Sequence, residues 1–372
     1  MLRLAFRNLF QGKVRVLISV GGVALALMLI LALDAIFSGA EGQVTAYIDN
    51  SGADIFVAQE GVRNMHMASS SLPARVSERV KAVPGVESAT PILYVTNMVV
   101  VGAERNLAYI IGLPDEARIG GAWQIVEGAP AYAPKAKEAI IDRGVAAKSG
   151  VTLGIKVKIM GEEFTVSGLS QGTANLTNSV AFIAMSDFSR LRGDSSTISF
   201  LLVKVEPGES PAAVATRIEV RVKNVTALPR TAFAEGERKV IRDMGTDIVA
   251  IMNLVGFFIG LAVMALMVYT ATLSRRAEYG VLKALGASNG HLYRSVLAQA
   301  MISVGLGLAL GIAVTLLLAA VVPYLGLNLA LAVSGESLVK VAGVSLVIAG
   351  LSAVLPIKQI AGLDPATVFR GR

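Results

Sequence analysis

The sequence predicts an α-helical membrane protein with four transmembrane helices and an extracytoplasmic α+β domain inserted after the first of them. Of the 372 residues, 54% are hydrophobic and 16% are charged, whereas about 25% are charged in a typical soluble domain. Four apolar runs are each at least 20 residues long, which is the length a helix needs to cross a bilayer. The region between the first and second runs contains no other run of that length.

The first predicted span comprises residues 16–37, and Asp34 is its single ionisable residue. Because Asp34 lies three positions from the outer end, it can reach the interface and avoid most of the about 2.5–3.5 kcal/mol that a central carboxylate costs. Ser38-Gly39-Ala40 offers a signal-peptide cleavage site. The apolar run exceeds the 7–15 residues of a signal peptide, so we expect the span to be retained.

Residues 2–13 precede this span and read LRLAFRNLFQGK. Leu2, Phe6 and Leu9 share one helical face, while Arg3 and Arg7 lie off it. This pattern predicts an amphipathic helix in the cytoplasmic headgroup layer, and a disordered basic leader is the alternative. Residues 1–38 therefore form the first predicted segment, an amphipathic helix followed by a transmembrane helix.

Residues 39–230 have the lower hydropathy of a soluble domain and form the second predicted segment. Period-2 runs predict strands, and helical spacing with Pro, Gly or capping signals predicts helices. The expected strands are residues 92–101, 107–112, 138–142, 156–160, 164–169, 181–184 and 200–205, with a hairpin turn at Gly161-Glu162-Glu163. The expected helices are residues 73–82, 143–149, 186–191 (a capped helix) and 211–222. Strands and helices mix without regular alternation, which favours an α+β fold.

Residues 231–372 form the third predicted segment. Residues 231–247 carry mixed charge directly into the second span, residues 248–273. One helix through residues 231–275 would be about 65 Å long and would stand above the membrane as a stalk. A helix broken at Gly245 is the alternative.

The third and fourth predicted spans are residues 295–322 and 338–357. Gly305, Gly307 and Gly311 are spaced for close helix packing in the third span, which we expect to end at Pro323. Residues 324–333 are too short to span and predict an outer loop or re-entrant turn. Lys340 can snorkel from the outer end of the fourth span. Asp364 before Pro365 predicts the start of a short C-terminal helix.

A polar connection, residues 274–288, joins the second and third spans and reads SRRAEYGVLKALGAS. On a helix, Ala277, Val281 and Leu285 share one face with Leu282 beside them, while Arg276 and Lys283 lie opposite. Glu278 lies among the apolar residues, where a carboxylate is costly unless a partner pairs with it. Gly286 is expected to end the helix by C-cap chemistry. A solvated turn that only sets topology is the alternative to a docking helix.

This connection resembles that of the FtsX-like permeases, the membrane subunits of MacB-type (type VII) ABC transporters. The resemblance rests on two arginines followed by Glu-x-Gly and Leu-x-Ala-Leu-Gly-Ala. The resemblance implies that residues 274–288 are a coupling helix docking into a groove of a separate ATPase. The residues it singles out are Arg275, Arg276, Glu278, Gly280, Leu282, Lys283, Leu285 and Gly286. The order of the glycine-containing and strand motifs in residues 144–185 is similar to that of the periplasmic core domain of MacB-like permeases, although this likeness is looser.

Lysine and arginine occur in the segments before span one, between spans two and three, and after span four. The short loop between spans three and four has only Glu336 before Lys340. By the positive-inside rule, both termini and the connection are cytoplasmic and the inserted domain is extracytoplasmic. With the family resemblance, this predicts a multi-pass protein of the bacterial cytoplasmic (inner) membrane.

The sequence gives no sign of a thiolate site, a nucleotide-binding loop, a nucleic-acid surface or a catalytic set. The chain lacks cysteine and contains no G-x-x-x-x-G-K-[ST] phosphate loop, so it has no thiolate site and no Walker nucleotide site. The net charge of +7 is concentrated at span ends, and we expect no nucleic-acid partner. No catalytic set stands out, so we expect a non-catalytic subunit that binds no cofactor or metal, with ATP and magnesium in the partner ATPase.

A few polar residues remain candidates for contact with a substrate. Asn253, Gln299 and Ser303 lie within spans, where single polar side chains more often bond another helix. His66 and His291 are expected on opposite sides of the membrane and cannot share a metal. Met65-His66-Met67 has ligand types suited to haem iron or copper, although a loop with flexible apolar side chains is the simpler interpretation.

The resemblance implies a transport subunit that couples ATP hydrolysis to export or extraction of an amphipathic substrate by mechanotransmission. Two copies would pair with two ATPase subunits in the lipid bilayer, with a periplasmic adaptor as a further partner. Lipid, lipoprotein, drug, peptide and haem are all open as substrates. The alternative is a non-transporting signalling subunit that activates an extracytoplasmic partner such as a cell-wall hydrolase.

Overall fold

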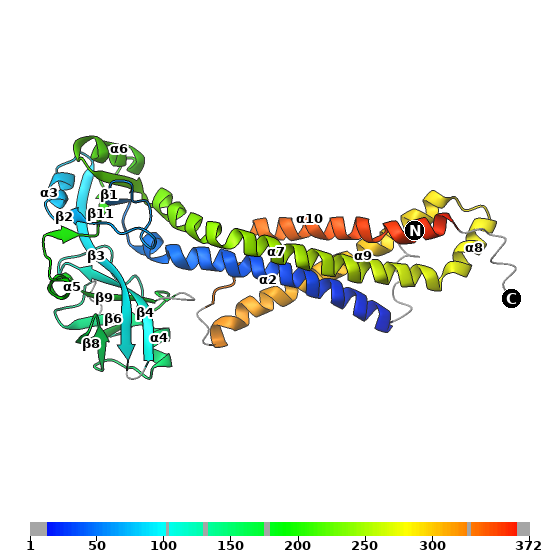
Figure 1. Ribbon diagram of the computed structural model, residues 1–372, viewed down its shortest axis with the longest axis horizontal. Helices are drawn as coiled ribbons and strands as arrows, with labels where there is room; N and C mark the ends of the chain where they lie inside the picture. Colours follow the sequence, from blue (N-terminus) through cyan, green and yellow to red (C-terminus); the bar gives the residue numbers. More distant parts are fainter. Residues whose placement is uncertain (1–12, 102–103, 129–132, 175–178, 326–328, 363–372) are drawn as a thin grey trace. The chain divides into compact units, whose positions relative to one another are not determined.

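The computed structural model describes residues 13–101, 104–128, 133–174, 179–325 and 329–362 (Figure 1). The chain forms two compact units. The first is built from residues 1–39, 245–325 and 331–372, and the second from residues 40–244 and 326–330. The helix expected from Asp364 lies outside the described residues. So does the helix expected at residues 2–13, apart from its last residue.

The first unit is helical. Within the described residues, four helices are long and apolar enough to cross a membrane, which confirms the expected number of spans. The helices that contribute to this unit are α2 (Lys13–Asn50), α7 (Arg230–Ser274), α8 (Arg276–Ala284), α9 (Asn289–Val321), the 3₁₀ turn η1 (Val322–Leu325), α10 (Gly335–Ser352) and α11 (Val354–Ala361).

Glycines bring α7 and α9 into close contact with α2. An added Cβ on Gly256 of α7 would lie 2.7 Å from a side-chain atom of α2, and one on Gly260 would lie 3.2 Å from another. On α9, an added Cβ would lie 2.8 Å from an atom of α2 at Gly307 and 3.0 Å from an atom of α2 at Gly311. Both pairs have the small-xxx-small spacing of closely packed membrane helices. Gly305 was expected to share this role, but it has no described atom within 4 Å of an added Cβ.

An ion pair joins α2 to α10. Asp34 accepts a hydrogen bond from the Lys340 Nζ at 2.7 Å and another from the Ser337 hydroxyl. The Ala332 N–H also donates to the Ala35 carbonyl at 2.9 Å. The sequence predicted that Asp34 and Lys340 would each reach an interface separately; the fold instead pairs them, which satisfies both charges within the bundle.

Helix boundaries differ from expectation in several places. The alternative of a break at Gly245 is wrong, because α7 is one helix, and an added Cβ at Gly245 would overlap the Phe37 ring. Span one continues to Asn50, and α9 begins at Asn289 rather than at residue 295. The fourth span divides into α10 and α11 around Ala353. The physical reason is Pro356, which has no N–H to donate to the carbonyl of Ser352.

The second unit is organised around a ten-stranded mixed sheet in the order β12-β1-β11-β3-β4-β9-β6-β8-β5, with β7 paired to β3 and β8. β4 and β9 are parallel, as are β6 and β8. The strands are β1 (Ile55–Gln59), β3 (Val86–Val101), β4 (Glu104–Leu113), β5 (Ile125–Gly128), β6 (Glu138–Asp142), β7 (Lys156–Ile159), β8 (Glu162–Ser170), β9 (Ser179–Ala184), β11 (Phe200–Val205) and β12 (Val225–Pro229). A small separate sheet pairs β2 (Leu72–Pro73) with β10 (Thr197–Ile198).

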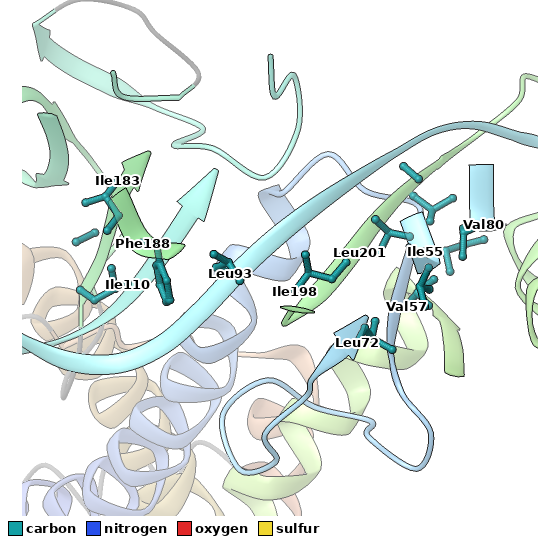
Figure 2. Packing of buried hydrophobic residues seen from close by; sticks show 14 of the residues in the cluster. Ile55, Val57, Leu72, Val80, Leu93, Ile110, Ile183, Phe188, Ile198 and Leu201 are labelled. Atoms are coloured by element: carbon teal, nitrogen blue, oxygen red, sulfur yellow. The ribbon is translucent and has the colours of Figure 1, made fainter. Parts of the chain in front are cut away.

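Both faces of this sheet are buried along β1, β9 and β11, and these strands are mostly apolar. In β1, Ile55 and Val57 face one hydrophobic cluster, whereas Phe56 and Ala58 face another. Figure 2 shows the first cluster, in which Ile55 and Val57 meet side chains from other strands and from the helix segment carrying Val80. The helices that cover this face are α3 (Val76–Lys81), α4 (Arg143–Lys148), α5 (Met185–Arg192) and α6 (Pro211–Arg221). The second cluster includes Phe233 of α7 and residues of α2.

The structure confirms the existence of most expected elements in this unit but corrects their bounds. The hairpin turn lies at Met160-Gly161, both with positive φ (52° and 89°), rather than at Gly161-Glu162-Glu163. This is the geometry of a two-residue type I′ turn. β3 begins at Val86 and passes through Pro91, which is tolerated because β4 pairs with β3 only from Leu93 onward.

Four helices and five strands also depart from the expectation. α3 begins at Val76, because the preceding Leu72–Pro73 pairs with β10. α4 ends at Lys148 and α6 at Arg221. α5 extends one residue beyond the expected helix at each end; its N-cap Ala184 makes no side-chain hydrogen bond, and Gly193 caps its C-terminus in the left-handed region. The missed strands are β1, β2, β5, β10 and β12.

A charged cluster lies on the surface of this unit. Glu162 accepts a hydrogen bond from Arg190 at 2.7 Å and another from Lys137. The Arg190 and Lys137 hydrogen bonds lower the pKa of the Glu162 carboxyl from 4.5 to about 2. The cluster therefore stabilises the ionised form of Glu162.

Candidate functional site

The candidate site is α8, the short helix between α7 and α9. Arg275 separates it from α7 with non-helical dihedrals (φ −112°, ψ 14°). Gly286 ends it in the left-handed region (φ +91°), where glycine has no Cβ penalty. The Gly286 N–H donates to Lys283 O at 3.0 Å, and the Ala287 N–H donates to Leu282 O at 2.9 Å. These two bonds form a Schellman motif, so the helix end expected at Gly286 is confirmed.

One side of α8 is held against the helical unit. Tyr279 and Gly280 are buried, and Tyr279 belongs to a cluster that includes Leu292 of α9 and Ile360 of α11. Burial raises the pKa of the Tyr279 hydroxyl, with a smaller contribution in the same direction from the nearby carboxylate of α8. Lys283 donates from Nζ to the carbonyls of Ile360 at 2.7 Å and Ala361 at 3.2 Å. A cation at these last carbonyls also complements the helix dipole of α11.

The opposite side of α8 is apolar and exposed. Val281 is 42%, Leu282 43% and Leu285 79% exposed, and Ala277 is exposed as well. This is the face that the helical spacing grouped together. In a folded chain, apolar side chains gathered on one exposed face mark a surface that contacts something else, such as a partner protein.

The charged residues of α8 lie where the helical wheel placed them, but the apolar face that carries Glu278 is exposed in this chain. Glu278 is 68% exposed and lies 3.9 Å from Arg275 Nη1, so its carboxylate carries no burial cost in this chain. Arg276 borders a cavity of about 120 Å³ with Gln359, Ile360 and the end of α7. A partner that covers Glu278 would have to supply a matching donor, because an unpaired buried carboxylate is destabilising.

The other candidates fall elsewhere. Ser303 is buried in α9 and Asn253 lies in α7. Within the described residues, the Ser303 hydroxyl and the Asn253 amide oxygen are buried without a hydrogen-bond partner. Gln299 is half-buried in α9 and His291 lies in its first turn. The described residues contain no group of three or more His, Cys, Asp or Glu side chains arranged to hold a metal.

Two family models match the chain. Residues 16–221 match the MacB-like periplasmic core domain, and residues 250–365 match the FtsX-like permease C-terminal domain. The first match alone covers more than half of the chain. The chain belongs to the FtsX-like, MacB-type family of ABC transporter permeases. The resemblance drawn from residues 274–288 is therefore confirmed at the level of the family.

Relatives of the permease carry the same description. An uncharacterized ABC transporter permease of Mycobacterium tuberculosis, present in two strains, is 23% identical over 378 residues and covers 100% of both chains. An uncharacterized ABC transporter permease of Methanocaldococcus jannaschii is 21% identical over 403 residues, covering 99% of the permease and 96% of the relative. The match with these relatives thus includes both units and α8.

Two solved structures were also compared with the permease. The periplasmic region of MacB from Actinobacillus actinomycetemcomitans has a TM-score of 0.40 and 12% identity, covering 50% of the permease and 94% of that chain. The extracellular domain of the ABC-type transporter YknZ from Gram-positive bacteria has a TM-score of 0.36 and 12% identity, covering 47% and 99% respectively.

Sequence reasoning named Lys283 as a site residue but missed its anchoring role, and it did not single out Tyr279. Tyr279 lies within the quoted motif, but its contacts with α9 and α11 depend on chain segments that follow it. The one available signal was its position on the helix, on the side opposite Ala277 and Val281. The acceptors of Lys283 are backbone carbonyls 77 and 78 residues away, and no side-chain pattern announces them.

Proposed function

We propose that this permease couples ATP hydrolysis by a separate ABC ATPase to the export or extraction of an amphipathic substrate, and that α8 is the helix on which the ATPase docks. The observation that carries the proposal is the division of α8 into two sides. Tyr279 and Lys283 attach one side to the helical unit, while Val281, Leu282 and Leu285 leave an apolar surface on the other. A helix that is packed against the helical unit on one side and exposes an apolar surface on the other can transmit the movement of a bound partner to that unit.

The attachments support transmission by several helices at once. A displacement of α8 acts on α7 through Arg275, on α9 through Ser288 and on α11 through Lys283. α7 has no break between Arg230 and Ser274, so it is suited to act as a lever. Mechanotransmission of this kind requires no passage of the substrate between the spans.

The assembly and orientation form part of the same proposal. Two permeases would pair with two ATPases in the bacterial inner membrane, with both termini and α8 cytoplasmic, the sheet-containing unit extracytoplasmic and ATP and magnesium held by the ATPase. A periplasmic adaptor is a further expected partner. The distribution of lysine and arginine among the short connections supports this orientation. A membrane-impermeant thiol reagent should fail to label a cysteine placed at Ser288 in intact cells; labelling there would reject the orientation.

The docking proposal is tested by binding of the ABC ATPase that is co-expressed with the permease. Leu285→Asp should weaken binding at least tenfold, because burying a leucine contributes about 1.5–3 kcal/mol. Val220→Asp is the matched control, since Val220 is an exposed apolar residue of α6. ATPase stimulation should fall with binding in the first variant and stay unchanged in the second. Equal binding of Leu285→Asp and the unaltered permease would reject α8 as the docking site.

A signalling role without transport makes a different prediction for the sheet-containing unit. Cross-linking from the outer side should then recover an extracytoplasmic enzyme such as a cell-wall hydrolase. Recovery of lipid, peptide or drug instead supports the transport proposal.

A further inference from the structure

A loop in the second unit is fastened directly to α7. The loop follows β1 and carries Met65, His66 and Met67. An added Cβ on Gly236 of α7 would lie 2.3 Å from the Arg63 carbonyl oxygen, so the loop backbone lies against the helix. Glu237, the next residue of α7, is fully buried and accepts hydrogen bonds from the N–H groups of Met65 and His66. A buried carboxylate thus fixes the conformation of this loop.

The same carboxylate orients the His66 ring. His66 Nδ1 lies 2.7 Å from Glu237 Oε2. We assign the proton to Nδ1, because the carboxylate that already accepts two N–H bonds acts most favourably as an acceptor. His66 Nε2 then carries the lone pair, and it is directed away from Glu237 because the two ring nitrogens diverge. In the described part of the chain, Nε2 has no hydrogen-bond partner.

The His66 ring borders a pocket of about 260 Å³. Its walls include Met65, Met67, Tyr94 and Phe200. The Tyr94 ring meets the imidazole edge-on with centroids 6.2 Å apart. Met65 is buried, whereas Met67 is 66% exposed and has freedom to move its thioether.

This set of groups has the chemistry of a soft metal site. A histidine that ligates a metal commonly donates its other ring N–H to a carboxylate, which fixes the tautomer and raises the basicity of the ligating nitrogen. Thioether sulfur favours soft ions such as Cu(I), and imidazole is compatible with them. Hard divalent ions prefer several carboxylates, and the pocket walls contain none.

We propose that His66 Nε2, together with the thioethers of Met65 and Met67, binds a soft monovalent metal ion of the Cu(I) and Ag(I) class. Glu237 is a positioning residue in this site, because it acts through the imidazole. Since Glu237 belongs to α7, an ion bound to His66 adds a constraint between the loop and this helix. The site does not depend on the docking of an ATPase.

Silver(I) is the probe, because it needs no reductant. The full-length permease in lipid nanodiscs is dialysed against Ag(I) in chloride-free buffer, and the bound silver is counted by mass spectrometry. One tight equivalent per chain is expected. His66→Ala should abolish it, and Met67→Leu should weaken it about tenfold while preserving size and apolar character. Glu237→Gln should weaken it about 10–100-fold, the effect typical of losing such a partner.

Met98→Leu is the matched control, because Met98 is an exposed methionine of β3 outside the pocket. It should bind Ag(I) as the unaltered chain does. Circular dichroism and the fluorescence of Trp123 report folding, and the exposed position of Met67 keeps the test valid if the buried Glu237→Gln substitution unfolds the loop. Tight binding that survives His66→Ala overturns the proposal, as does an equal loss from Met98→Leu and Met67→Leu. Binding of tetraphenylphosphonium that requires His66, without Ag(I) binding, also overturns it and assigns the pocket to organic cations.

Discussion

The connection between α8 and α11 gives a prediction whose size can be worked out from the structure. Lys283→Met keeps the apolar stem of the side chain but removes the two hydrogen bonds to the carbonyls of Ile360 and Ala361. A hydrogen bond to a charged group contributes about 1.5–3 kcal/mol. Lys283 is half-exposed, and solvent screening lowers this contribution. We therefore expect α8 to lose about 1–2 kcal/mol of local stability.

Hydrogen exchange of the α8 amides measures this loss. A change of 1–2 kcal/mol corresponds to a factor of about 5–30 in the equilibrium between closed and open states. Exchange at residues 281–285 of the permease in nanodiscs should accelerate by that factor in Lys283→Met. Arg276→Met is the control, because it removes the same charge from α8 and leaves both carbonyl contacts in place. Unchanged exchange in Lys283→Met, or equal acceleration in the two variants, would refute the reasoning.

Three further predictions concern packing, pairing and pH. Gly311→Ala should lower the thermal midpoint of the permease, because its Cβ would meet the backbone of α2, whereas Gly305→Ala has open space and should not; equal midpoints would contradict the packing. Lys340→Met should destabilise the permease more than the double variant with Asp34→Asn, because only the single change leaves an unpaired carboxylate; thermal melts of a full double-mutant cycle give the coupling, and a purely additive result would count against the pair. The pKa of Glu162 is lower in the fold than its ordinary 4.5, so the stability that its ionised form contributes is complete above pH 4.5 and disappears as the pH falls toward 2. Glu162→Gln should make the thermal midpoint depend less on pH between 4.5 and 2. An unchanged pH dependence in this variant would exclude the cluster as a source of acid sensitivity.

Local patterns predicted most helices and strands, but their bounds followed from the packing around them. The strand at 200–205 was expected with the observed bounds, because a short apolar run with β-branched residues needs few assumptions. β1 was missed although it is buried on both faces, because IFVAQ lacks the alternation of a strand with one exposed face. Pro91 hid the start of β3, since its tolerance depends on which neighbouring strand pairs at that point.

The candidate site was predicted in part. The apolar grouping on α8 and its end at Gly286 are local properties, because helical period and the left-handed conformation of a glycine depend on adjacent residues. The anchoring by Tyr279 and Lys283 was not predictable, because their contacts lie in α9 and α11. The role of α8 in docking stays a prediction until binding of an ATPase is measured.

The amino-acid sequence alone determined the number of membrane-spanning helices, because the length and composition of an apolar run decide whether a segment can leave water. The family resemblance also came from a contiguous stretch. Only the tertiary structure decided which charged and polar groups meet. Asp34 and Lys340 are 306 residues apart, and His66 and Glu237 are 171 residues apart. Such pairs form because a polar group that leaves water on folding needs a hydrogen-bonding or charged partner from the protein. The residues beside it in the chain carry no information about which distant partner the fold will bring near.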